Sequence, residues 1–529
     1  MNSKSIKYAE WITAILLSLT VLFLLVVRAE HAGGMWRDEC GVVQLARLPS
    51  LSEVVNNFQH EAFPPPFPLT IRLHTTLFGT SDISLRCFGL TVGIALIGVA
   101  WFNARVVGDG VPLVLLVLFG LNSTFLVWGT TIRGYGIGSV LIVLAFGLTA
   151  RLLREPKPSS VIAALLASIA AVQFLITNLV FAAAIAFSAT AACLIRRSMK
   201  LALVVAGIGL CCLLSTLFFL KAYFTADWNI VLQYPGHLSS LWGVFNFASG
   251  NAPLWQIIFL AAVIGGVWRL AVSWRRRLSP DSVVLIFSVL VCLTAPLACY
   301  AFLRFLNYNT QEWYYLSFVA LLAAAIDLIF ADLSQIRRVR VARLGFVIGI
   351  SIMLLLSAWP RVSKRQTTID LVAQKLQQEA SLNDLIVVNP WFVGVSFNWY
   401  YRGRTPWLTV PVINERRIHR YDFLKARMME LSPLSDLEKA MSATLESGNR
   451  VWLVGGARLL REGEAPLKLS PAPDPKFGWK NHIYKEAWSE QLGTFLQRHT
   501  RQVSVVLPPA SDVNIVENVP LWAAEGWRD

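Results

Sequence analysis

Long apolar blocks separated by short polar segments fill the first two thirds of the chain. Because a bilayer core of roughly 30 Å needs about 20 mostly apolar helical residues, each block predicts a membrane-spanning helix. We expect eleven spans, at about residues 11–28, 86–104, 111–128, 136–153, 160–176, 178–195, 201–222, 253–271, 282–303, 314–332 and 343–359. The pattern therefore predicts a polytopic α-helical membrane protein.

Residues 360–529 have a different pattern, in which helical and strand-type periodicities alternate. We expect helices at 370–380 and 482–499, strands at 384–389, 449–456 and 502–507, and a proline-rich loop at 462–479. Such alternation is typical of an α/β layer domain. The chain thus divides into a multi-span membrane domain, 1–359, and a C-terminal α/β domain, 360–529. The eight tryptophans of the second domain either pack in its core and at the membrane interface or stack on sugars.

Composition excludes an ordinary soluble enzyme, since 55% of the 529 residues are apolar, 15% are charged and the mean hydropathy is +0.55. The net charge is +15, of which residues 1–359 contribute +11 (25 basic minus 14 acidic) and the remainder +4 (22 minus 18). The seven cysteines include no Cys-x-x-Cys pair, which argues against a thiolate metal site and a disulfide framework.

The basic residues indicate topology and not nucleic-acid binding, because they recur in alternate loops. With a cytoplasmic N-terminus, six inner segments hold 17 of the 25 basic residues of the membrane domain, namely Lys4, Lys7, Arg105, Arg151, Arg154, Lys157, Arg196, Arg197, Lys200, Arg269, Arg275, Arg276, Arg277, Arg337, Arg338, Arg340 and Arg343. Cytoplasmic loops carry such an excess. We expect a protein of the cytoplasmic (inner) membrane with an uncleaved first span and an extracytoplasmic C-terminal domain.

The longest outer loop, about residues 30–85, is the most polar part of the membrane domain. It contains Asp38 and Glu39 in the segment GGMWRDEC, then His60 and Glu61 ahead of three prolines. The next segment, PFPLTIRLHTTLFG, is apolar with helical spacing but too short to span, which predicts an interfacial or re-entrant helix. Such helices lie beside cavities at membrane depth.

Two further outer turns add candidate substrate-binding groups. Arg133, with Tyr135 two residues on, lies in a short turn, and Arg304 precedes a Trp-Tyr-Tyr segment near another. An arginine at the headgroup plane either snorkels to the interface or holds a phosphate with two hydrogen bonds. Together with the outer carboxylates, these groups suit transfer of a group from a lipid phosphate to a hydroxyl, in which a carboxylate removes the proton and cations stabilise the departing phosphate.

The order of these motifs resembles the GT-C superfamily of membrane glycosyltransferases, especially the protein O-mannosyltransferase and aminoarabinose transferase group. The resemblance covers about residues 1–330 and includes the acidic pair, LxxRLHxxLFG, SLRCFGLTVG (84–93) and the Arg-x-Tyr turn. It implies a polyprenyl-phosphate-sugar donor, inversion at the anomeric carbon, Asp38 with Glu39 beside it as catalytic acids, and Arg133 on the donor phosphate. The acceptor is a hydroxyl of a glycan, lipid or protein.

Some members of that family hold a divalent metal ion, and Glu61 matches the position of the metal-binding acid. Relatives have polar residues before the arginine that matches Arg133, and this chain has Gly129, Thr130, Thr131 and Ile132 there instead. His237 is the one other outer-face histidine of the membrane domain that stands out as a metal ligand. A possible metal is therefore a minor expectation, which the proposed reaction does not require.

Two other classes of function remain as alternatives. A transporter or flippase usually has ionisable residues near the membrane midplane, whereas here the acids gather at one face. A non-catalytic scaffold that presents residues 360–529 predicts that Asp38, Glu61 and Arg133 are all exchangeable. The transferase hypothesis requires these three groups to converge on one pocket at the outer rim of the bilayer.

Overall fold

The computed structural model describes residues 3–107, 110–234, 237–274, 280–307 and 310–528. Within these residues nine helices are long and apolar enough to cross a membrane. They are α1 (Ser3–His31), α5 (Asp82–Val107), α7 (Gly134–Arg154), α9 (Asn178–Ile195), α10 (Met199–Thr225), α13 (Ala252–Trp274), α14 (Pro280–Leu306), α15 (Leu316–Leu333) and α16 (Arg337–Val362). The chain is thus a multi-pass membrane protein, as its apolar pattern predicts.

Two of the eleven expected spans differ from the prediction. The block at 160–176 is α8 (Pro158–Phe174), an apolar helix of 17 residues. The block at 111–128 is broken into α6 (Leu113–Leu115) and two π-helical turns, η2 (Leu116–Gly120) and η3 (Phe125–Gly129). Asn122 interrupts it, because its side-chain oxygen accepts from the backbone N–H groups of Thr124 and Phe125. The segment is buried by other helices, where irregular backbone is tolerated at membrane depth.

The first outer loop folds into short helices at one end of the bundle. These are α2 (Arg37–Ala46), α3 (Leu51–Asn57), the 3-10 turn η1 (Phe58–His60) and α4 (Pro66–Phe78), which is the short helix expected after the prolines. Further along the chain, α11 (Trp228–Val231), α12 (Leu238–Ser249) and the 3-10 turn η4 (Glu312–Tyr315) connect the long helices.

The C-terminal domain is a five-stranded mixed sheet with helices packed on it. Its strands run in the order β2-β1-β3-β5-β4, with β1 parallel to both β2 and β3, and β5 antiparallel to both β3 and β4. Its elements are α17 (Ile369–Glu379), β1 (Leu385–Val388), α18 (Val393–Tyr400), β2 (Trp407–Thr409), α19 (Tyr421–Met428), α20 (Ser435–Glu446), β3 (Val451–Val454), α21 (Asn481–His499), β4 (Thr500–Leu507), the 3-10 turn η5 (Ile515–Glu517) and β5 (Leu521–Trp527). These elements include the helices and strands that the sequence pattern predicts.

Four of the eight tryptophans of the C-terminal domain are buried in hydrophobic cores. Trp391, Trp399, Trp452 and Trp488 are all buried. Their rings are enclosed by neighbouring side chains in the hydrophobic cores and therefore offer no face for a sugar. This favours the packing interpretation over sugar stacking for these four.

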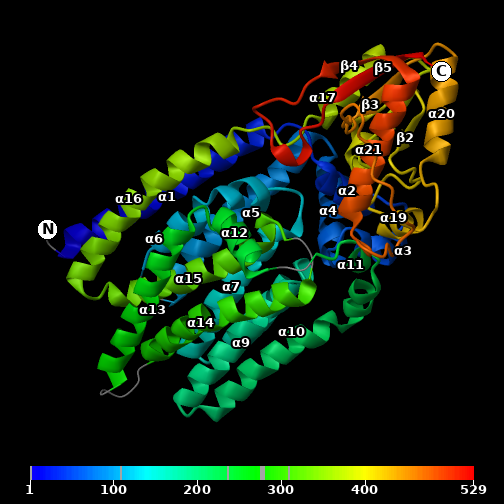
Figure 1. Cartoon of the computed structure of the whole chain (residues 1–529). Helices are drawn as coiled ribbons and strands as arrows, with labels where there is room; N and C mark the ends of the chain where they lie inside the picture. The colour runs from blue at the N-terminus through cyan, green and yellow to red at the C-terminus, as the bar shows by residue number, and fades with distance from the viewer. Residues whose placement is uncertain (1–2, 108–109, 235–236, 275–279, 308–309, 529) are drawn as a thin grey trace.

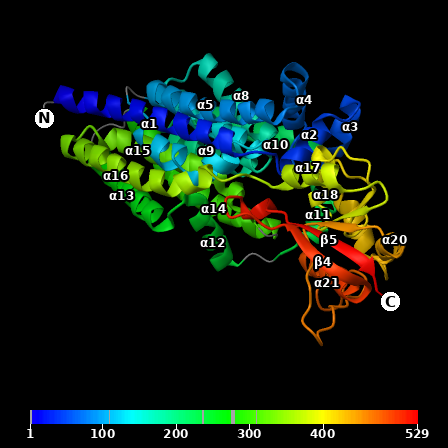
Figure 2. The ribbon, with the colours of Figure 1, turned by 90° about the horizontal axis from the view of Figure 1, so that it is seen from above.

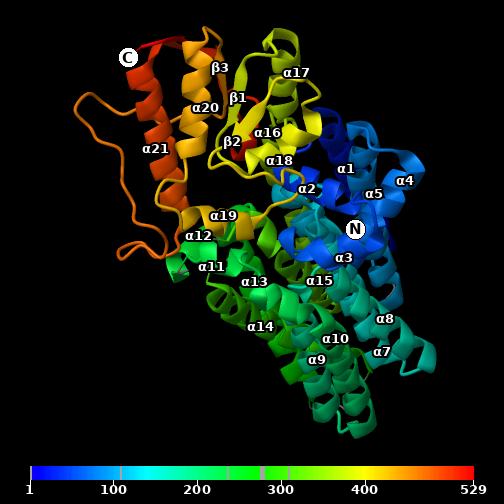
Figure 3. The ribbon, with the colours of Figure 1, turned by 90° about the vertical axis from the view of Figure 1, so that its right-hand side faces the viewer.

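The C-terminal domain lies on the end of the bundle that carries the first outer loop, far from the N-terminus (Figures 1 and 3). Helix α18 packs on α2, where Gln44 donates from Nε2 to the carbonyl of Val395 at 3.0 Å. The Tyr400 hydroxyl donates to Asp82 at 2.8 Å and accepts from the N–H of Met35. Polar contacts therefore hold the sheet domain directly against the first outer loop.

The opposite end of the bundle carries the basic residues that the topology places inside. A cavity there is bordered by the ends of several spans and is lined by Lys7, Arg154, Arg340 and Arg343 together with four acids. Figure 2 shows the N-terminus and the C-terminal domain at opposite ends of the long helices. Arg275, Arg276 and Arg277, expected in the same set of loops, lie outside the described residues.

Candidate active site

The N-terminal turn of α2 places two neighbouring carboxylates in different environments. Glu39 is fully buried. Its carboxylate accepts hydrogen bonds from Arg86 Nη1 at 2.8 Å and from the backbone N–H of Ile132 at 2.9 Å. It also accepts from the backbone N–H of Trp36 and so caps its own helix. Its oxygens are thus used in holding α2 against α5 and the turn before α7. Asp38 lies beside it with its side chain 21% exposed.

The expectation that Glu39 is a catalytic acid together with Asp38 stays a prediction, which these contacts do not favour. Successive residues of a helix point about 100° apart, so only one of the two carboxylates faces the cavity described below. Glu39 does not line that cavity, whereas Asp38 does. We assign Glu39 a structural role, because its charge is already neutralised by a buried guanidinium.

Arg133 reaches the same place from the turn that precedes α7. Its Nη2 lies 3.8 Å from Asp38 Oδ2, and its Nη1 lies 3.3 Å from Glu61 Oε2 and 3.2 Å from the Asp38 carbonyl oxygen. The guanidinium also lies over the ring of Phe63, 4.4 Å from its centroid. The turn is tightly packed, since a Cβ on Gly136 would lie 1.7 Å from the Gly129 carbonyl oxygen.

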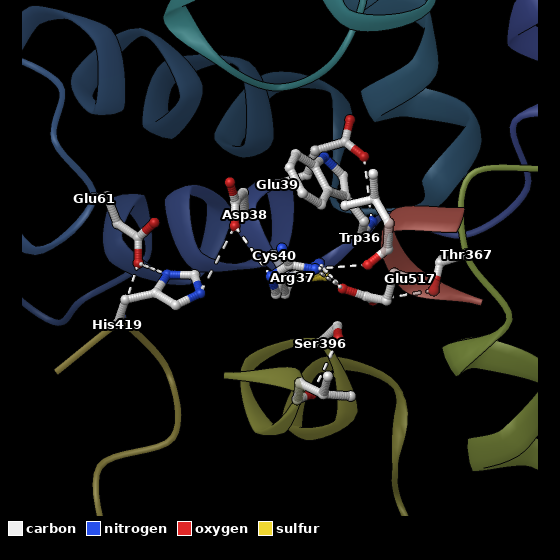
Figure 4. A network of polar contacts seen from close by, with 12 residues as sticks. Trp36, Arg37, Asp38, Glu39, Cys40, Glu61, Thr367, Ser396, His419 and Glu517 are labelled. Atoms are coloured by element: carbon white, nitrogen blue, oxygen red, sulfur yellow. Dashed lines mark hydrogen bonds and ion pairs between the residues drawn. The ribbon is translucent and has the colours of Figure 1, made fainter. Parts of the chain in front are cut away.

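Glu61 connects Arg133 to the C-terminal domain. It is buried, and its Oε1 accepts from both the N–H and the Nδ1 of His419, at 3.0 and 2.8 Å. Figure 4 shows His419 between Glu61 and Asp38, with its Nε2 3.9 Å from Asp38 Oδ1. The carboxylates of the first outer loop therefore meet a histidine that is more than 350 residues further along the chain.

The charges around Asp38 keep it ionised. Burial alone favours the neutral acid, but the positive charges of Arg133 and then of Arg37, with a smaller contribution from His419, lower the pKa of Asp38 below its usual value. The same carboxylate raises the pKa of Arg133 against the opposing effect of its burial. A carboxylate that is ionised at neutral pH and partly accessible is able to accept a proton.

These groups line a cavity of about 630 Å³ between the membrane helices and the C-terminal domain. Asp38, His60, Glu61, Arg133 and Tyr135 all border it, as the transferase hypothesis requires. Apolar side chains from several spans form much of the remaining wall: Leu175, Ile176, Leu179, Val180, Leu220, Tyr223, Phe224, Phe302, Phe305 and Leu306.

Two expected residues lie elsewhere. Arg304 is exposed near the end of α14 and does not line the cavity, although its neighbours Phe302 and Phe305 do. His237 is exposed at the start of α12 and is likewise not among the lining residues. The helix phase of α14 explains the first case, since it turns the two aromatic rings and not the guanidinium toward the cavity.

The expected metal ion does not fit the residues around Glu61. Within the described ranges, no group of three or more His, Cys, Asp or Glu side chains is arranged to hold a metal. Both Glu61 oxygens already accept hydrogen bonds, and one of the donors is the guanidinium of Arg133, whose positive charge would repel a cation. Glu61 is therefore part of an ion-pair network in this chain and not a metal ligand.

The residues that sequence inspection missed all come from the C-terminal domain. His419 and Tyr421 line the cavity, and the buried Glu517 accepts from the N–H of Arg37 at 2.9 Å, next to Asp38. His419 lies in the loop after β2, within VINERRIHRY, where no periodicity and no motif distinguishes it. His419 can be identified as a site residue only from the fold, which brings this loop onto the first outer loop.

Three solved structures are similar to this chain. ArnT from Cupriavidus metallidurans bound to undecaprenyl phosphate matches with a TM-score of 0.48 at 12% identity, over 84% of this chain and 92% of that chain. The apo state of the same protein gives 0.45 at 13% identity over the same shares. The Archaeoglobus fulgidus oligosaccharyltransferase, in complex with Zn and sulfate, gives 0.47 at 12% identity, over 83% of this chain and 67% of that chain.

Comparison of the sequence gives no such match, since no protein-family model and no curated protein is similar to it. At these identities and scores the likeness is confined to the general course of the chain. The function therefore has to come from the chemistry of the site itself.

Proposed function

We propose that the protein is an inverting glycosyltransferase that moves a sugar from a polyprenyl-phosphate donor to a hydroxyl acceptor. The observation that carries this proposal is the pairing of an ionised, accessible carboxylate, Asp38, with a guanidinium, Arg133, 3.8 Å away in a largely apolar cavity. A base for a hydroxyl, a cation for a phosphate and apolar walls for a lipid chain are the three requirements of this reaction.

In the proposed reaction, Asp38 accepts the proton of the acceptor hydroxyl as its oxygen attacks the anomeric carbon of the sugar. The new carbon–oxygen bond forms on the face opposite the phosphate, so the configuration at that carbon is inverted. The bond from the anomeric carbon to the phosphate oxygen breaks, and its electron pair leaves with the lipid phosphate. Arg133 stabilises that developing negative charge.

The walls of the cavity support a lipid-linked donor. Phe302, Phe305 and Leu306 of α14 face Leu175 and Ile176 of the α8–α9 connection across the same space. Apolar walls bind isoprenoid carbons by removing them from water. A soluble nucleotide-sugar donor would leave most of this surface without a matching partner.

The orientation of the site follows from charge. We assign the end that carries Lys7, Arg154 and Arg340 to the cytoplasm, because basic residues accumulate on that side. The cavity and the C-terminal domain then face the extracytoplasmic side of the inner membrane. The acceptor would reach Asp38 from that side.

A transporter or flippase is the alternative function. The ionisable groups lie together at one end of the bundle, and His419 and Tyr421 of the C-terminal domain line the same cavity. This placement favours a reaction site at the membrane surface over a transport pathway through the membrane. A flippase would move labelled lipid between the leaflets of a vesicle without breaking the bond between sugar and phosphate.

Purified protein incubated with a panel of polyprenyl-phosphate sugars tests the proposal. We expect one of them to release free polyprenyl phosphate in the presence of an acceptor, and we expect Asp38→Asn to reduce that release by about 10² to 10⁴-fold. Wild-type release by Asp38→Asn, in protein of normal abundance, would remove Asp38 from the reaction. Movement of intact donor between leaflets without release would favour the flippase.

A further inference from the structure

His419 is held by the first outer loop, lines the cavity, and has one ring nitrogen without a hydrogen-bond partner among the described residues. Its side chain is buried, its Nδ1 lies 2.8 Å from Glu61 Oε1, and within the described part of the chain its Nε2 has no hydrogen-bond partner. A buried polar atom without a partner is uncommon. Here it borders a space large enough for a ligand.

The contact with Glu61 sets the chemical state of the ring. A carboxylate accepts hydrogen bonds, so Nδ1 carries a proton, and in the neutral ring Nε2 is then the acceptor. The ring is also held from both sides by aromatic groups: Tyr421 is stacked on it at 6.3 Å between centroids, and Trp391 meets it edge-on at 6.1 Å. Nε2 therefore points to a fixed place.

That place is next to the proposed base. Nε2 lies 3.9 Å from Asp38 Oδ1, too far for a direct hydrogen bond. A hydroxyl oxygen about 2.8 Å from each atom would have normal hydrogen-bond distances to both. The two groups thus lie on either side of a position suited to an attacking hydroxyl (Figure 4).

We propose that Glu61 and His419 form a carboxylate–imidazole pair that binds the acceptor hydroxyl beside Asp38 and takes over its proton. This inference rests on the proposed transferase function and adds a second catalytic residue, supplied by the C-terminal domain. The same order of groups, carboxylate, imidazole and hydroxyl, is an effective arrangement for withdrawing a proton from an alcohol.

The hydroxyl proton passes to Asp38 as the oxygen–carbon bond forms. After the product leaves, a water molecule between the two groups passes the proton on from Asp38 to His419 Nε2. The resulting imidazolium lies between the carboxylates of Asp38 and Glu61, which stabilise its charge. The proton finally leaves to water in the cavity, and Asp38 is again ionised for the next acceptor.

The charged and titratable groups that surround the imidazole come from three parts of the fold. Asp38 and Glu61 belong to the first outer loop, Arg133 to the turn before α7, and Tyr421 to α19 of the C-terminal domain. Burial raises the pKa of the Tyr421 hydroxyl, so that group stays neutral near pH 7.

Two substitutions separate catalysis by His419 from its structural role. His419→Asn keeps an amide where Nδ1 now donates to Glu61 but has no group at the position of Nε2, whereas His419→Ala leaves room for a free imidazole. We expect each variant to lower kcat by roughly 10²-fold, with unchanged affinity for polyprenyl phosphate. Thermal unfolding should be close to that of the wild type for His419→Asn and lower for His419→Ala, which leaves the buried Glu61 without its side-chain donor. Added imidazole should restore activity to His419→Ala. His482→Asn, on α21 and away from the cavity lining, is the matched control.

A wild-type rate in His419→Asn, or no rescue of a folded His419→Ala by imidazole, would overturn this role while Asp38→Asn remains inactive. Wild-type activity of Asp38→Asn would instead reject the transferase reaction as proposed.

Discussion

The backbone N–H of Arg37 donates to Glu517 Oε2 at 2.9 Å, and the guanidinium of the same arginine lies 3.3 Å from that oxygen. This contact joins the residue before Asp38 to the last 3-10 turn of the C-terminal domain. The other Glu517 oxygen accepts from the Thr367 hydroxyl at 3.0 Å. One buried carboxylate thus ties the start of α2 to two segments of that domain (Figure 4).

Replacement of Glu517 should therefore loosen the start of α2. Glu517→Ala leaves buried donors of Arg37 and Thr367 without an acceptor, which costs about 1–3 kcal/mol for each unsatisfied group. We expect a lower thermal unfolding temperature in nanodiscs and a reduced kcat, since Asp38 follows Arg37 directly. Glu525→Ala is the control, because Glu525 is half exposed and lies 3.8 Å from Arg450; a surface pair contributes about 0–1 kcal/mol. Equal losses in the two variants would contradict the role of Glu517.

Removal of the positive charge at Arg133 should shift the pH dependence of transfer. In the proposed reaction Asp38 acts only when it is ionised, so we expect activity to decline as the pH falls through its lowered pKa. Arg133→Gln removes the first cation that lowers this pKa, and the decline should then move to higher pH. The measurement is kcat against pH at saturating donor. Arg498→Gln, an exposed change on α21, should leave the profile in place. A shift toward lower pH would have the wrong sign for an ion pair.

Arg133 should also matter more for the donor than for the acceptor. A hydrogen bond to a charged group contributes about 1.5–3 kcal/mol, so Arg133→Ala should weaken binding of polyprenyl phosphate by roughly 10- to 100-fold. The acceptor KM should change much less. Titration of the purified variant with polyprenyl phosphate alone measures the donor side. Kinetics in which the acceptor KM rises and donor affinity is unchanged would remove Arg133 from the phosphate site.

The parts of the site that the sequence predicts are those marked by local pattern. Asp38, Glu61 and Arg133 are ionisable residues in short polar segments between apolar blocks, and such residues are conspicuous in a membrane protein. Their convergence on one cavity is expected from topology, because the loops on one face of a bundle meet there. The α/β pattern of residues 360–529 was equally visible in its alternating periodicities.

The remaining parts depend on long-range packing. Asp38 and Glu39 are adjacent acids, and only the rotation of α2 against α5 decides which one faces the cavity. His419 is surrounded in the sequence by Arg416, Arg417 and Arg420, a composition typical of a solvated loop. Its role depends on the docking of the sheet domain, which no local pattern encodes.

The structural role of Glu39 leads to a final prediction. Breaking a buried ion pair by removing one partner costs about 3–5 kcal/mol, because the other charge stays buried and uncompensated. Glu39→Gln leaves Arg86 in that position, with the backbone carbonyls of Gly33 and Gly34 as its other acceptors. We expect low protein abundance and a lower unfolding temperature, and we expect the folded fraction to transfer sugar at close to the wild-type kcat.

The conservative control is Glu53→Gln on the exposed side of α3, a change that should alter stability by no more than about 0.5 kcal/mol. The two substitutions should then have different effects. Loss of the first charge reduces the amount of folded protein, while loss of the second reduces turnover in protein that is folded. A stable Glu39→Gln protein with a kcat as low as that of Asp38→Asn would contradict the role of Glu39 in stability and would assign it a role in catalysis or in positioning Asp38.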